Sequence, residues 1–153
     1  MNCSRKQATT TRCSRKLQIL RGQFPAALET AKQETDAFWR DWAMSLAYTA
    51  LGDLAASDAI LPAYISRNSD TGAYQIAQMY ALRGESDQVF RWLDHAWETQ
   101  DAGFGGWPQD PLFVRYQGDP RYTGFVRRIG QKQATNLVAP PPGIGVPRPS
   151  AQR

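Results

Sequence analysis

Three glycines recur at nearly equal spacing and constrain what this chain can fold into. Gly22, Gly52 and Gly84 lie 30 and 32 residues apart, each between two segments with helical hydrophobic periodicity. Glycine ends a helix easily because it adopts the left-handed conformation without steric cost. A hairpin of two amphipathic helices cannot bury both apolar faces alone, so neighbouring hairpins share one core. The spacing therefore predicts an all-α fold of repeated helix hairpins.

The clearest hairpin spans residues 73–98. Arg83 precedes the turn at Gly84 and places a cation at the negative end of the first helix dipole, and Ser86 is predicted to cap the second helix. Both halves carry apolar and small side chains at the spacing of one helix face: Ala73, Ile76, Ala77 and Tyr80, then Val89, Leu93, Ala96 and Trp97.

The preceding hairpin follows the same plan. We expect a helix over residues 35–51, a stop at Gly52, and a second helix that Asp53 caps and Pro62 interrupts. A turn at residues 68–70 then leads into the next hairpin. Upstream, Gly22 precedes a helix that begins near Pro25 and is predicted to be the last part of another hairpin.

Two Asp-Pro pairs follow the last hairpin. Asp110-Pro111 and Asp119-Pro120 each predict a short helix, because an N-cap carboxylate followed by proline favours a helix start. Gly130 is predicted to end the second of these helices. The glycine-rich stretch 101–108 is predicted to be a connector whose Phe104 and Trp107 pack on the last hairpin.

Charge separates the ends of the chain from its middle. All fourteen Asp and Glu lie between Glu29 and Asp119, whereas residues 1–22 carry six Lys and Arg and residues 125–153 carry five. The net charge of +4 therefore comes from the ends, and it is no evidence that the folded surface attracts nucleic acid. We expect three parts: a disordered basic N-terminus over 1–13, a helical domain over 14–130, and a disordered proline-rich tail over 131–153.

The beginning of the chain contains no apolar run of a secretory signal, and no stretch is apolar enough for a transmembrane helix. We therefore expect no membrane insertion and a cytoplasmic location. An acid-free start rich in Arg, Ser and Thr also matches an organellar transit peptide. A start codon placed too far upstream gives the same pattern.

No constellation of residues indicates catalysis, a metal or a cofactor. Cys3 and Cys13 fit no zinc or redox spacing, and one histidine leaves a His and Cys site short of ligands. His95 follows Asp94, but adjacent residues on a helix point about 100° apart, so Asp94 is poorly placed to orient the imidazole. We expect His95 to be a partly exposed surface residue and the chain not to be an enzyme.

These hairpins resemble the tetratricopeptide repeat (TPR) family, which carries a small residue, then Tyr, then Gly, then Ala in the second helix. Ala77, Tyr80, Gly84 and Ala96 match this pattern, as do Tyr48 and Gly52 one repeat earlier. The resemblance covers about residues 14–100. The part that follows, with its two Asp-Pro pairs and Gly130, is similar to the C-terminal end of bacterial regulators that carry such repeats. This likeness implies an α-solenoid of two to three hairpins with a C-terminal helical cap. The first unit lacks most of its first helix, which suggests a superhelix cut from a longer protein, with a complete gene product as the alternative.

The resemblance also implies a binding surface. In TPR proteins the first helix of each hairpin lines a concave groove that holds a peptide, and packing between hairpins is the alternative role of the same positions. Carried over by register, the groove residues here are Trp42, Leu46, Thr49, Tyr74, Gln78 and Ala81.

Two functional hypotheses follow from the sequence. The first is a protein–protein interaction module that binds a protein or peptide in this groove, with Trp42 and Tyr74 as anchors. A second copy of the chain is a further candidate partner, because an incomplete N-terminal end of a solenoid exposes an apolar face. The alternative is a nucleic-acid or anionic-surface binder that acts through the basic ends and loses affinity with added salt.

Overall fold

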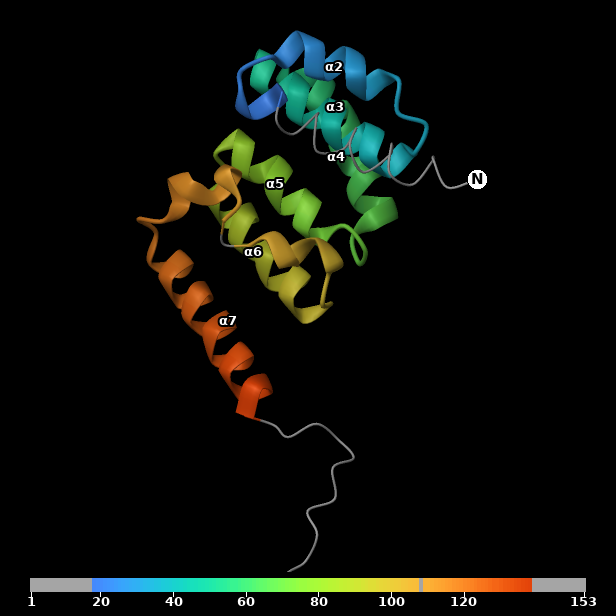
Figure 1. The fold of residues 1–153 in the computed structure, drawn as a ribbon. Helices are drawn as coiled ribbons and strands as arrows, with labels where there is room; N and C mark the ends of the chain where they lie inside the picture. The colour runs from blue at the N-terminus through green and yellow to red at the C-terminus, as the bar shows by residue number, and fades with distance from the viewer. Residues whose placement is uncertain (1–17, 108, 139–153) are drawn as a thin grey trace, which may run out of the picture. The chain divides into compact units, whose positions relative to one another are not determined.

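The computed structural model describes residues 18–107 and 109–138, and within these residues all regular structure is helical, with no strand (Figure 1). The expected all-α class is therefore confirmed. Predicted segment 1–13 lies outside the described residues, as do residues 139–153 of the predicted tail. The chain divides into two units after Tyr116. The α-helices and the 3₁₀ helices (η) follow one another in this order: α2 (Phe24–Lys32), α3 (Ala37–Leu51), α4 (Leu54–Asn68), α5 (Ala73–Arg83), α6 (Ser86–Glu98), η1 (Ala102–Gly106), η2 (Pro111–Tyr116) and α7 (Pro120–Val138).

The predicted glycine turns are present. Gly52 and Gly84 are left-handed, with φ of 83° and 82°, and they end α3 and α5. Beyond the first turn, the Asp53 carboxylate accepts a hydrogen bond from the Ala56 amide at 3.1 Å and caps α4 as predicted. These turns form two consecutive helix hairpins, α3 with α4 and α5 with α6.

Several predicted helix boundaries are wrong. Pro62 lies inside α4 and does not interrupt it, since one missing amide hydrogen bond does not outweigh the burial of Leu61 and Tyr64 beside it. Ser86 begins α6 but is not its cap, because the N-cap residue is Glu85 and its side chain makes no capping bond.

The two Asp-Pro segments begin helices as predicted, but the second helix is longer than expected. Asp110 and Asp119 both accept a hydrogen bond from the backbone amide two residues later, as expected of caps, and the first segment forms the short 3₁₀ helix η2. Gly130 does not end the second. Its φ is not positive, good helix formers follow it, and α7 continues to Val138.

Helix α5 lies at the centre of the first unit. It packs against α3, α6, η1 and η2, and eight of its eleven residues are buried. A helix that is covered on all sides needs partners for its polar side chains, and α5 carries Gln75 and Gln78 on its buried surface. The hydrogen bonds of this helix therefore decide how the segments around it are arranged.

Hydroxyl groups join the two hairpins near their turns. The Ser57 hydroxyl lies 3.0 Å from that of Ser45 and 2.9 Å from that of Thr49, and both serines are fully buried. Arg83 of α5 donates to the Ser57 hydroxyl at 3.3 Å and to the Asp58 carboxylate at 2.6 Å. The cation that was predicted at the end of the helix dipole thus also connects α5 to α4.

Replacing Gly84 by Ala should lower the free energy of unfolding by about 1–2 kcal/mol, because an L side chain at φ 82° is strained. An added Cβ meets only Arg115 Nη1, at 3.9 Å, so crowding contributes little. Gly105→Ala is the matched control, since its φ is not positive and nothing lies within 4 Å of an added Cβ. Urea denaturation of both variants measures the difference, and equal losses would contradict the account.

Tyr64 supplies a pH-dependent prediction. Its side chain is fully buried, its hydroxyl has no hydrogen-bond partner among the described residues, and burial raises its pKa well above the ordinary value, with smaller contributions from Asp101 and Asp41. The unfolded chain therefore loses this proton first, and stability falls as the pH rises above about 10.

Tyr64→Phe should be neutral or stabilising by about 1 kcal/mol at pH 7, because it removes an unpaired buried hydroxyl. It should also make the loss of stability above pH 10 less steep. Thermal unfolding from pH 7 to pH 11 measures both effects. A variant that is less stable at pH 7, with an unchanged alkaline slope, would show that the hydroxyl is satisfied in the folded chain.

Candidate functional site

The six predicted groove residues lie inside the first unit. Thr49 is half-buried, and the other five are buried: Trp42, Leu46, Tyr74, Gln78 and Ala81. Trp42, Leu46 and Thr49 belong to α3, which packs against α2, α4 and α5. Tyr74, Gln78 and Ala81 belong to α5, which packs against η1 and η2, so the chain's own segment 101–116 covers this part of the predicted groove. The Tyr116 hydroxyl, for example, donates to the Ala81 carbonyl at 2.8 Å.

A chain of buried hydrogen bonds holds this segment in place. We call Trp42, Tyr74, Gln78 and Asp110 the Asp110 network. The Trp42 indole N–H donates to Gln78 Oε1 at 3.1 Å, and Gln78 Nε2 donates to Asp110 Oδ2 at 2.6 Å. The Tyr74 hydroxyl donates to the same carboxylate oxygen at 2.9 Å. The network therefore joins α3, α5 and the start of η2 in one polar chain.

Asp101 fastens the other end of the segment. Its Oδ2 accepts from the Tyr74 amide at 3.1 Å in the first turn of α5, while Oδ1 accepts from the Gly103 amide at 2.7 Å. The backbone passes so close here that a Cβ on Gly103 would lie 2.7 Å from Gln75 Nε2. One carboxylate thus caps a helix that begins 28 residues earlier and fixes the glycine-rich connector against it.

Aromatic rings complete the cover, and Phe104 packs on the last hairpin as predicted. Phe104 contacts Tyr74 and Trp97 at centroid distances of 5.8 and 5.6 Å, and Trp107 meets Phe113 at 5.0 Å. The predicted groove residues therefore form an interior surface. A partner-binding role for them stays a prediction, and it requires segment 101–116 to move away.

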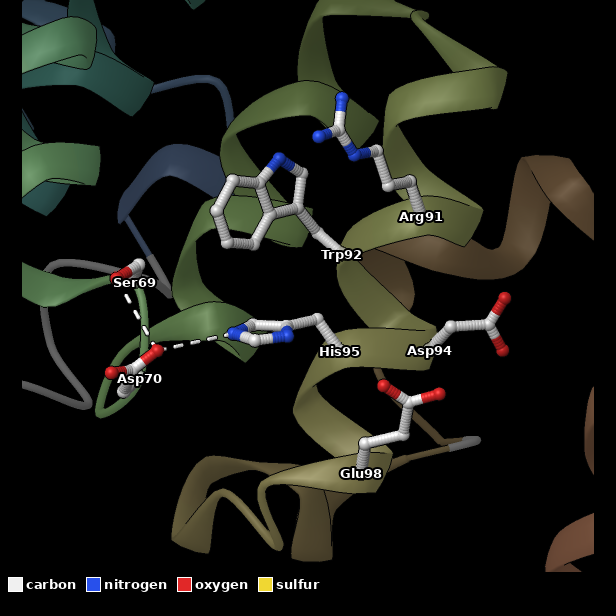
Figure 2. A pocket seen from close by; sticks show the side chains of 7 residues that line it. All are labelled: Ser69, Asp70, Arg91, Trp92, Asp94, His95 and Glu98. Carbon is white, nitrogen blue, oxygen red and sulfur yellow. Dashed lines mark hydrogen bonds and ion pairs between the residues drawn. The ribbon is translucent and has the colours of Figure 1, made fainter.

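An open concave site lies elsewhere, on α6 (Figure 2). It has a volume of about 400 Å³ and combines the turn after α4 with the outer side of α6. We call it the α6 pocket, and it is lined by Ser69, Asp70, Arg91, Trp92, Asp94, His95 and Glu98.

Asp70, not Asp94, is the carboxylate nearest to the imidazole. His95 Nε2 lies 3.4 Å from Asp70 Oδ1, and Figure 2 shows Asp94 pointing away from the ring. The Trp92 indole meets His95 edge-on at a centroid distance of 5.6 Å. The His95 side chain is 36% exposed, which confirms the predicted surface histidine.

The lining of the α6 pocket suits the cationic side chains of Lys and Arg. Its lining contains three carboxylates, those of Asp70, Asp94 and Glu98, together with the guanidinium of Arg91 and the indole of Trp92. In the described part of the chain, no group of three or more His, Cys, Asp and Glu side chains could hold a metal ion. An exposed carboxylate and an aromatic face together attract Lys and Arg side chains.

Comparisons with protein-family models, with curated proteins and with solved structures find no match to this chain. Among residues 18–107 and 109–138, no helix has the length and apolar character needed to cross a membrane.

Neither the Asp110 network nor the α6 pocket could be predicted from sequence patterns, and the reason is the same for both. Asp110 is predicted as a local cap, and that bond exists, but its bonds to Tyr74 and Gln78 span 36 and 32 residues. Asp70 is predicted as part of a turn, and its approach to His95 spans 25 residues. No local spacing indicates such contacts.

Removing the carboxylate of Asp110 should destabilise the fold. Asp110→Ala leaves the Tyr74 hydroxyl and the Gln78 amide without their buried acceptor, and we expect a loss of about 2–4 kcal/mol in urea denaturation. Asp87→Ala, on the exposed part of α6, is the control and should cost less than about 1 kcal/mol. Similar losses for both variants would contradict a closing role for the Asp110 network.

Proposed function

We propose that this chain is a non-catalytic protein-interaction module, an α-solenoid of TPR-like hairpins that receives a Lys- or Arg-bearing segment of a protein partner at the α6 pocket. The observation that carries the proposal is the contrast between the two faces. The predicted groove residues on α5 lie against segment 101–116 and those on α3 are buried or half-buried, whereas the α6 pocket is open and combines an indole with an excess of carboxylates. The consecutive hairpins α3–α4 and α5–α6, with left-handed glycines at both turns, support the repeat architecture.

The chemistry of recognition follows from the pocket lining. A guanidinium or ammonium group stacked on Trp92 gains about 0.5–1 kcal/mol at an exposed site, and each exposed ion pair with a carboxylate adds about 0.2–1 kcal/mol. His95 lies beside both the Asp70 carboxylate and the edge of Trp92, so the indole and a carboxylate are close together in the pocket. These increments give a weak, salt-sensitive affinity, in the micromolar to millimolar range.

The location of the pocket suits a partner that binds without unfolding the module. Its residues come from α6 and from the turn after α4, and none of them belongs to the Asp110 network. Binding there leaves the central helix covered. We place the interaction in the cytoplasm, and the alternative function through the basic ends stays a prediction, because residues 1–17 and 139–153 lie outside the described part of the chain.

Fluorescence anisotropy with a labelled oligoarginine peptide tests the proposal. The full chain should bind this peptide, and it should not bind an oligoglutamate peptide of the same length. Glu98→Gln should weaken binding about two- to fivefold, since it removes one exposed ion-pair partner from the pocket.

Asp87→Asn is the matched control, because it changes the net charge by the same amount on the same helix but outside the pocket. It should leave the affinity for oligoarginine nearly unchanged. Equal weakening by both variants would show that the peptide responds to overall charge, and the proposed site would then be wrong.

A further inference from the structure

The α6 pocket contains one side chain that can change its charge near neutral pH. Among the described residues that line the pocket, that side chain is His95, which is also the only histidine in the sequence. A histidine side chain gains a proton as the pH falls from about 8 to about 5, whereas carboxylates and guanidinium groups keep their charges over most of this range. Mild acidification therefore changes the charge of the pocket at a single position.

The imidazole lies beside a carboxylate that a partner can also reach. His95 Nε2 is 3.4 Å from Asp70 Oδ1, and Ser69 Oγ lies 3.4 Å from the same oxygen (Figure 2). The Asp70 side chain is 81% exposed, and that of His95 is 36% exposed. The Asp70 carboxylate therefore faces the imidazole on one side and solvent on the other.

The other charges at the pocket come from α6 itself. Arg91, Asp94 and Glu98 line it, and Asp94 points away from the ring (Figure 2). Helix α5 packs against α6 but supplies no side chain to the pocket lining. The ionisable side chains of the neighbouring elements have contacts elsewhere: Arg67 with Asp41, Tyr74 with Asp110, Arg83 with Asp58 and Glu85, Tyr80 near Glu85, Arg83 and Arg91, and Asp101 with the Tyr74 and Gly103 amides.

We infer that His95 makes partner binding at the α6 pocket sensitive to pH, because the protonated ring competes with the partner's Lys or Arg for the Asp70 carboxylate. This inference rests on the proposed function and adds a form of regulation to it. With a neutral imidazole, the three carboxylates exceed the single guanidinium by two charges. An imidazolium reduces this excess to one and lies nearest to Asp70, so the affinity for a cationic segment falls as the pH falls.

The exposure of these groups limits the size of the effect. An ion pair between exposed groups contributes little, so loss of the pair with Asp70 should weaken partner binding about two- to fivefold. Proton binding and partner binding are coupled reciprocally, so a bound cation must oppose protonation of His95 by the same factor. That factor corresponds to a shift of about 0.3–0.7 pH unit in the titration of the imidazole.

Fluorescence anisotropy with the labelled oligoarginine peptide, at pH 7.5 and pH 5.5 and at constant ionic strength, tests the inference. The full chain should bind about two- to fivefold more weakly at pH 5.5. His95→Gln should bind equally at both pH values, because glutamine is neutral at each. Asp70→Asn should lose most of the difference, whereas Glu98→Gln, which removes a carboxylate from the same pocket, should keep it.

The reciprocal effect can be measured at the imidazole of the untagged wild-type chain. Because the sequence contains one histidine, its Cε1–H resonance is identified without ambiguity in NMR spectra. Saturating oligoarginine should move the midpoint of its titration to lower pH by about 0.3–0.7 unit. An oligoglutamate peptide of the same length should leave the midpoint unchanged. This titration needs no variant, so it does not depend on how any substitution folds.

Three results would overturn the inference: equal affinity of the wild-type chain at the two pH values, a pH dependence that persists in His95→Gln, and a titration midpoint that does not move at saturation. The same measurements separate this inference from the proposed function. Binding of oligoarginine without pH dependence contradicts only the role of His95. Failure to bind oligoarginine at either pH contradicts the proposed function and, with it, the inference.

Discussion

A buried carboxylate on a short connecting segment organises this molecule. Asp110 accepts hydrogen bonds from Tyr74 and Gln78 of the central helix, and through Gln78 it is connected to Trp42 of the preceding hairpin. A charge removed from water is tolerated only where such partners surround it. The position of segment 101–116 and the alignment of the two hairpins therefore depend on one another, because neither satisfies its buried polar groups without the other.

This arrangement changes where recognition can take place. A stack of helix hairpins offers the inner faces of its first helices to a ligand, but here α5 already packs against η1 and η2, and the corresponding side chains of α3 are buried or half-buried. The polar surface of α6 stays accessible, and it brings together side chains from two turns of the helix and from the loop after α4 (Figure 2). Closing the inner face both stabilises the module and leaves the α6 pocket as the site that we propose for a partner.

Local rules explain which parts of the fold could be predicted. The left-handed glycines at positions 52 and 84 and the cap at Asp53 depend on a few neighbouring residues, so the sequence pattern was sufficient to place them. Pro62 and Gly130 are unfavourable residues in a helix interior, but α4 and α7 continue through them. Propensity is a weak constraint when neighbouring residues favour the helix or gain burial from it.

The candidate sites depend on contacts between distant residues, which no single-sequence pattern specifies. Gln78 was expected to face a ligand, and it does bond a carboxylate, but the carboxylate belongs to the same chain. The pocket around His95 needs Asp70 from another element, whereas the resemblance to a repeat family implies a site on α3 and α5. The sequence could predict which residues share one face of α5, but it could not predict that segment 101–116 covers this face.

Hydrogen exchange of the indole N–H groups, followed by NMR, tests the central claim most directly. The sequence contains five tryptophans, and the structure places Trp42 in the buried network and Trp92 at the open pocket. If the inner face is closed, the Trp42 indole N–H exchanges far more slowly than that of Trp92, at a rate limited by opening of the fold. Equally fast exchange at both residues would mean that segment 101–116 does not cover the inner face in solution.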